Sequence, residues 1–127
     1  MRSSAVKRYD PYVHADSLGI RVEHQTLRTA NGIWLPDERL IILRASMRAV
    51  QLRSTLAHEL GHVEYAHRDD RPKHEIQADR YAVDNLIDLD ECREMMKWSP
   101  DCHLLAAELN VSTRLMRVFL NVHHLAG

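Results

Sequence analysis

The stretch of residues 55–63 contains the pattern His-Glu-x-x-His, which constrains this chain more than any other segment. On a helix, residues four apart lie on one face at about 6 Å from each other, so His58 and His62 can each direct a nitrogen at one cation. Two imidazoles in this arrangement are typical of a tetrahedral zinc site. Glu59 lies one position further round the helix, where its carboxylate can reach a water molecule beside that cation.

The pattern needs support from its surroundings, because the chain contains nine histidines. That support is a set of apolar residues at helical spacing, which predicts a helix with one buried side: Leu52, Leu56, Leu60 and Val63. Ser46 is a suitable N-cap, so the helix is expected to run from about residue 47 to residue 67.

A third metal ligand is expected from the next helical segment, which follows Pro72. Glu75 and Asp79 are four residues apart and share a helix face. A catalytic zinc keeps three protein ligands and one open position, so Glu75 can complete a His-His-Glu site. Asp79 can then accept the far N–H of a ligand imidazole. An acidic pair alone more often marks a solvated helix face, so the assignment depends on the preceding motif.

Three segments together carry a resemblance to a known family: residues 34–43, residues 55–63, and the Glu-x-x-Ala-Asp run that begins at Glu75. They resemble the ImmA/IrrE family of Glu-zincin metallopeptidases, and the match extends over nearly the whole chain. The resemblance implies a zincin-like fold, a Zn²⁺ cofactor and cleavage of a regulatory protein such as a helix-turn-helix repressor of a phage or mobile element. The family usually has a longer spacer between His62 and Glu75, so a tight turn is expected here.

The remaining patterns predict an α+β fold in one domain over residues 1–127. Asp10 and Pro11 suit the start of a short helix. Period-two alternation and β-branched residues then predict three short antiparallel strands at 20–25, 33–35 and 40–43, packed on the motif helix. The expected parts are an N-terminal helix and sheet at 10–45, zinc-binding helices at 46–89 and a helical C-terminal subdomain at 90–127.

The C-terminal part leaves DNA binding open as one alternative function. Residues 106–118 are similar to the core of a helix-turn-helix, and Arg114 and Arg117 would lie on its second helix. A DNA-reading helix usually carries more basic charge, and the net charge of the chain is −1. We therefore expect packing or partner docking from these helices, and DNA binding is disfavoured.

The expected function is zinc-dependent hydrolysis of a peptide bond, with Glu59 as the general base. Four residues beside the metal segment are candidate donors to a developing oxyanion: Tyr65, His67, His74 and Tyr81. A second alternative is a zincin-fold module that sequesters a repressor without cutting it, although such a module has no need of Glu59.

The location is expected to be cytoplasmic. The two cysteines suit a reducing compartment, residues 1–9 lack the apolar segment of a signal peptide, and no run is long enough to span a membrane. The patterns leave the oligomeric state, the cleavage site and the choice between host and phage origin open.

Overall fold

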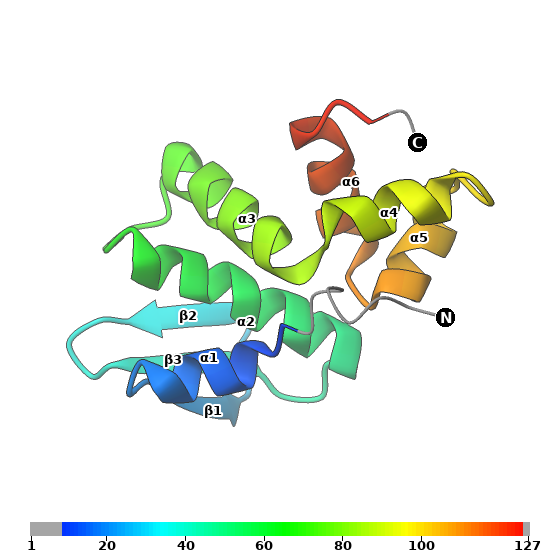
Figure 1. Ribbon diagram of the computed structural model, residues 1–127. Helices are drawn as coiled ribbons and strands as arrows, with labels where there is room; N and C mark the ends of the chain where they lie inside the picture. The colour runs from blue at the N-terminus through cyan, green and yellow to red at the C-terminus, as the bar shows by residue number, and fades with distance from the viewer. Residues whose placement is uncertain (1–8, 126–127) are drawn as a thin grey trace.

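Three strands and six helices make up residues 9–125, which are the residues described by the computed structural model (Figure 1). In chain order they are α1 (Pro11–Ser17), β1 (Arg21–Gln25), β2 (Gly32–Leu35), β3 (Leu40–Arg44), α2 (Ala49–Glu64), α3 (Pro72–Leu86), α4 (Leu89–Met96), α5 (Cys102–Leu109) and α6 (Thr113–Val122). This arrangement confirms the α+β class. None of these helices is long and apolar enough to cross a membrane.

The sheet is mixed, so the prediction of three antiparallel strands is wrong in one pairing. The strand order is β1-β3-β2: β2 pairs antiparallel with β3, whereas β1 pairs parallel with β3. The physical reason lies in the apolar character of β3, where Leu40, Ile41 and Leu43 are buried. The most apolar strand takes the central position, and the half-exposed strands β1 and β2 take the two edges.

One face of the sheet packs against the first two helices. Ala15 of α1, Leu56 and Leu60 of α2, and Ile41 and Leu43 of β3 belong to one buried cluster. The helix α1 begins as predicted, because the Asp10 carboxylate accepts the backbone N–H of Tyr12 at 2.9 Å. In Figure 1, α2 lies between the sheet and α3. The motif helix is therefore a central element, covered by the sheet on one side and by α3 on the other.

The predicted start of the motif helix is wrong by two residues. Ser46 has a φ of 71°, which is the left-handed conformation of a turn, so it cannot act as the N-cap. The helix α2 begins at Ala49, and its N-cap residue Arg48 makes no side-chain capping hydrogen bond. The turn that leads the chain from β3 into α2 therefore occupies the residues that the sequence pattern assigned to the first helical turn.

A close contact between α2 and α3 sets the position of the second ligand-bearing helix. A Cβ atom added at Gly61 would lie 2.6 Å from the Cα of Ala78 and 2.7 Å from its carbonyl oxygen. Real side chains do not approach backbone atoms so closely, so only glycine fits at this crossing. Gly61 lies between the two motif histidines, and Ala78 lies one turn after Glu75. The crossing therefore brings Glu75 towards the histidines.

The last three helices, α4 to α6, form a second apolar cluster with α3. Leu115, Met116 and Phe119 of α6 are fully or almost fully buried in it. The helix α3 ends at Leu86, earlier than predicted, because the Asp88 carboxylate caps α4 by accepting the N–H of Glu91 at 2.8 Å. Cys92 and Cys102 are free thiols.

Candidate metal centre

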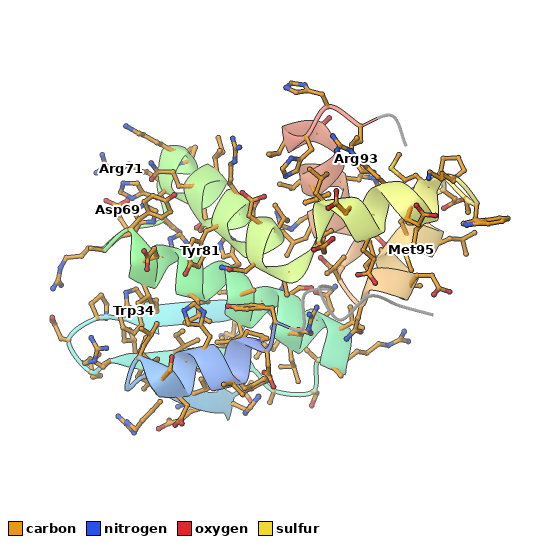
Figure 2. All side chains as sticks on the ribbon, viewed as in Figure 1. Trp34, Asp69, Arg71, Tyr81, Arg93 and Met95 are labelled. Atoms are coloured by element: carbon orange, nitrogen blue, oxygen red, sulfur yellow. The ribbon has the colours of Figure 1, made fainter. Side chains whose placement is uncertain are left out.

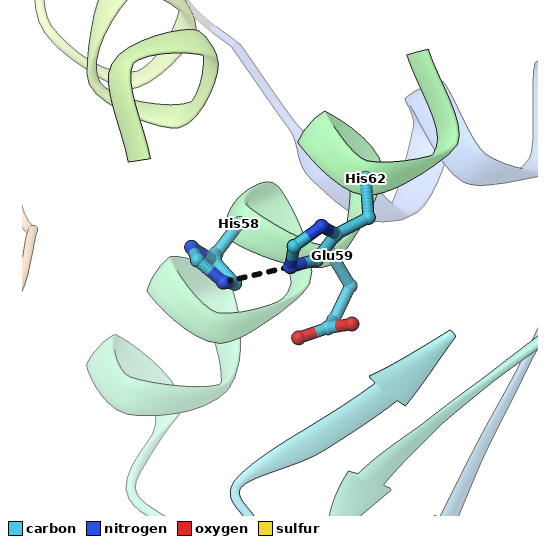
Figure 3. Close-up of side chains that lie close together, drawn as sticks. All are labelled: His58, Glu59 and His62. Atoms are coloured by element: carbon cyan, nitrogen blue, oxygen red, sulfur yellow. Dashed lines mark hydrogen bonds between the residues drawn. The ribbon is translucent and has the colours of Figure 1, made fainter. Parts of the chain in front are cut away.

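Three potential ligands meet at the α2–α3 crossing. The Nε2 atoms of His58 and His62 are 3.2 Å apart. The two carboxylate oxygens of Glu75 lie 2.8 Å from the Nε2 of His58 and 3.0 Å from the Nε2 of His62. Figure 3 shows the two imidazoles turned towards each other, with the Glu59 carboxylate beside them. The i,i+4 spacing of the motif and the helix crossing at Gly61 together produce this convergence.

These donor atoms suit a tetrahedral zinc ion. Ligands at about 2.05 Å from a tetrahedral cation lie about 3.3 Å from one another, and the three separations here are within about 0.5 Å of that value. The carboxylate of Glu59 is also near, since its donor atom and those of the two histidines all lie within 4.8 Å of each other. Glu75 contacts both imidazoles directly, so it is better placed than Glu59 as the third ligand.

Asp79 lies behind His58, on the side away from the converging atoms. Its Oδ1 is 2.7 Å from the Nδ1 of His58. The guanidinium of Arg114 on α6 holds the same carboxylate with contacts of 2.8 and 2.9 Å. Although burial alone would raise the pKa of Asp79, the hydrogen bonds from His58 and Arg114 lower it to about 2. Asp79 is therefore a permanent acceptor for the outer nitrogen of His58.

The two histidines differ in the direction of their pKa shifts. Burial disfavours the charged form of both rings. For His58 the hydrogen bond to Asp79 and the surrounding carboxylates outweigh burial, so its pKa is raised. For His62 burial and the neighbouring His58 lower the pKa. The carboxylate-rich surroundings of His58 favour positive charge at the point where the three donors meet.

Glu59 of α2 is buried on the side of the helix that faces the sheet, and strand β2 passes close to its side chain. A Cβ atom added at Gly32 would lie 3.1 Å from the Cγ of Glu59 and 2.8 Å from the Cγ2 of Thr55. Burial and the nearby Glu75 raise the pKa of Glu59 to about 7, against the opposing effect of His58. A carboxylate with a pKa near neutrality is suited to accept a proton and release it again.

The converging atoms open into a cavity of about 630 Å³. Its walls come from separate parts of the fold: β2 and the residues before it, the middle of α2, the loop that joins α2 to α3, and the start of α6. Asp69 and Arg71, labelled in Figure 2, belong to that loop. Within the described part of the chain, β2 pairs with β3 alone, so its other edge has no strand partner. Gly32, Ile33 and Trp34 of β2 line the cavity.

The four candidate oxyanion donors lie in different places. His67 lines the cavity, but both of its ring nitrogens have partners, His62 and Gln77. His74 contacts the Asp69 carboxylate at 2.7 Å, and Tyr65 and Tyr81 contact each other edge to face. The residues that line the cavity do not include these last three. The structure thus brings one of the four to the cavity.

Two residues that contact the partners of the candidate ligand histidines, Arg114 and Gln77, are not indicated as such by the sequence patterns. Arg114 lines the cavity and binds Asp79, and Gln77 binds His67. The sequence pattern suggests only a DNA-contacting place for Arg114, on the second helix of a helix-turn-helix. Its distance in sequence from the motif removes any local signal. Gln77 lies two residues after Glu75, about 200° round α3, so the face shared by Glu75 and Asp79 does not indicate it.

Known proteins show similarity to this chain in fold and in family. Among solved structures, a Mycobacterium tuberculosis transcriptional regulator is similar in fold, with a TM-score of 0.70 and 19% sequence identity. The similarity covers 87% of this chain and 39% of that chain, so this chain spans well under half the length of the regulator. No curated protein matches the chain. Residues 15–121 match the Peptidase M78 family model, described as an IrrE N-terminal-like domain, and the chain therefore belongs to this family of zinc-dependent metallopeptidases.

Proposed function

We propose that this chain is a zinc-dependent endopeptidase that cuts a regulatory protein, such as a helix-turn-helix repressor, in the cytoplasm. One observation carries the proposal. The Nε2 atoms of His58 and His62 and the carboxylate of Glu75 converge within 3.2 Å of one another, beside a buried Glu59. A site that only needs to bind zinc has no use for an additional, proton-accepting carboxylate at this position.

In the proposed reaction, His58, His62 and Glu75 hold the zinc ion. When bound, the zinc supplies Lewis acidity, which activates a water molecule and polarises the peptide carbonyl. Glu59 accepts a proton as the water oxygen adds to the carbonyl carbon. The C–N bond then breaks, and Glu59 returns the proton to the departing amine. Asp79 and Arg114 keep His58 oriented throughout the reaction.

The free edge of β2 supports an extended peptide as the substrate. An extended peptide can pair with an exposed strand edge through backbone hydrogen bonds. Three consecutive residues of β2 line the cavity that contains the metal ligands, and Gly32 allows this strand to approach Glu59. A peptide paired with β2 therefore places its backbone carbonyls along the cavity.

The choice of a repressor as substrate has two supports. The family resemblance implies regulatory proteins of phages or mobile elements, and the similar solved structure is named as a transcriptional regulator. The cytoplasmic location is supported by the free thiols of Cys92 and Cys102. DNA binding through α6 has less support, because Arg114 is engaged by Asp79 and much of the helix is buried.

The experiment compares wild-type protein with Glu59→Gln, using a helix-turn-helix repressor encoded next to the gene as substrate and mass spectrometry of fragments as the readout. Glutamine keeps the shape of the side chain but cannot accept the proton, so cleavage should fall by about 10²- to 10⁴-fold while zinc content and repressor binding persist. Stable binding of the repressor without cleavage by either protein would favour the sequestering module. Equal cleavage by both proteins would remove Glu59 from the mechanism.

A further inference from the structure

His67 follows shortly after the end of α2, and backbone hydrogen bonds at that helix end hold it close to His62. The backbone N–H of His67 donates to the carbonyl of His62 at 2.9 Å, and the N–H of Ala66 donates to Val63 at 3.0 Å. These two bonds form a Schellman motif, with Ala66 in the left-handed conformation at a φ of 53°. Glycine is the usual residue at this position, so the cap places His67 beside His62 at some conformational cost.

The His67 ring is held on both faces and at both nitrogens. It stacks on the His74 ring at 3.9 Å with an interplanar angle of 11°, and on the Tyr65 ring at 5.5 Å with an angle of 12°. Its Nδ1 lies 2.9 Å from the Nδ1 of His62, and its Nε2 lies 2.8 Å from the Oε1 of Gln77. The residue is 6% exposed. The ring therefore has one orientation, set by four neighbours.

The positions of the protons decide which residue donates in the hydrogen bonds from His62 to His67 and from His67 to Gln77. A metal-ligating imidazole nitrogen carries no proton, so a neutral His62 that ligates through Nε2 has its proton on Nδ1. That proton must be donated to the Nδ1 of His67. A neutral His67 then carries its own proton on Nε2 and donates it to the Oε1 of Gln77. The opposite direction would put a proton on the Nε2 of His62, at the point where the ligands converge.

We propose that His67 is a positioning residue for His62: it accepts the Nδ1–H of that ligand, and Gln77 fixes its tautomer. The inference rests on the metal site of the proposed function, and its readouts do not require peptide cleavage. Asp79 has the equivalent place behind His58, but as an anionic acceptor. The two ligand histidines are thus oriented by different chemistry, a carboxylate for one and a neutral imidazole for the other.

The first test measures the zinc dissociation constant by competition with a chelator. His67→Phe keeps a flat ring between Tyr65 and His74 but removes both hydrogen bonds, and the affinity should weaken by about 10- to 100-fold. Ala66→Gly is the matched control, because it retains the helix cap and should leave the affinity unchanged. Circular dichroism of the zinc-free proteins checks that each variant is folded.

The second test examines whether His67 donates its hydrogen bond to Gln77, a residue that is only partly buried. Gln77→Glu can only accept a hydrogen bond and should retain zinc affinity, whereas Gln77→Lys can only donate and should lose about 10-fold or more. Ile76→Glu and Ile76→Lys introduce the same charges at the neighbouring residue, which is 69% exposed. These variants control for long-range electrostatic effects on the zinc affinity. Nitrogen-15 NMR of the imidazoles in the wild-type protein should show the His67 proton on Nε2.

Several results would overturn the proposal. They are an unchanged zinc affinity in a folded His67→Phe protein, a His67 proton found on Nδ1, or equal effects of the charge changes at Gln77 and Ile76. A wild-type protein that binds no zinc would contradict the metal site itself. A wild-type protein that binds zinc as tightly as His67→Phe would contradict only the role of His67.

Discussion

Replacing Gly61 with alanine should damage the metal site without touching a ligand. The added Cβ would lie 2.6 Å from the Cα of Ala78, whereas non-bonded carbon atoms are comfortable at about 3.5–4.0 Å. The atoms that it meets belong to the backbone of α3, so no side-chain rotation relieves the overlap. The two helices must therefore move apart by about 1 Å.

This movement has a larger effect on zinc binding than on folding. Overpacking costs about 1–3 kcal/mol, and alanine returns about 1 kcal/mol of helix propensity, so the zinc-free protein should lose at most about 2 kcal/mol of unfolding free energy. Glu75 lies on α3 one turn before Ala78 and moves with it. Metal sites tolerate displacements of about 0.2 Å, so the zinc affinity should fall by more than about 100-fold.

Urea unfolding of the zinc-free protein and chelator competition for zinc measure the two quantities separately. The double variant Gly61→Ala/Ala78→Gly is a sharp control, because the overlap involves backbone atoms of residue 78 and removal of its side chain should not restore zinc binding. Wild-type zinc affinity in Gly61→Ala, or full rescue by the second substitution, would refute the reasoning.

The remaining predictions concern the outer partner of His58, the bound zinc and the strand β2. Asp79→Asn should keep the zinc but weaken its affinity by about 10- to 100-fold in a chelator competition, since the outer partner of His58 becomes neutral. Chelation should lower the melting temperature of the wild type, because zinc at 100 times its dissociation constant stabilises the fold by about 2.7 kcal/mol, and His62→Ala should show no such response. Gly32→Val should slow cleavage while zinc content, measured by atomic emission, stays near one per chain, because the new side chain pushes β2 away from Glu59.

Much of the local structure could be predicted because its signals are local. Asp10 and Pro11 mark the start of α1, and Asp10 does cap that helix. The strand pairing could not be predicted in the same way, because nothing in the alternation of β1 says that β3 will lie beside it in parallel. The turn at Ser46 was also hidden, since serine is a common N-cap and its left-handed conformation is set by the path from β3 to α2.

In the candidate site, too, local sequence patterns indicate some features, whereas others depend on how distant segments pack. The i,i+4 spacing of His58 and His62 places both rings on one helix face, and the family match over residues 15–121 confirms the family that the motifs indicated. The contacts of Arg114 depend on how α6 packs on α3, which no local pattern specifies. His67 stood out as a neighbour of the motif, but its contact with His62 depends on the cap at Ala66, which lacks the usual glycine.

The most direct test of the metal centre is a crystal structure of the zinc-loaded protein with anomalous data collected on both sides of the zinc absorption edge. We predict one anomalous peak per chain, bound by the Nε2 atoms of His58 and His62 and by the carboxylate of Glu75, with Glu59 beside it and unbound. A peak ligated by Asp79 or Glu59 in place of Glu75, or the absence of a peak between the two histidines, would contradict the account.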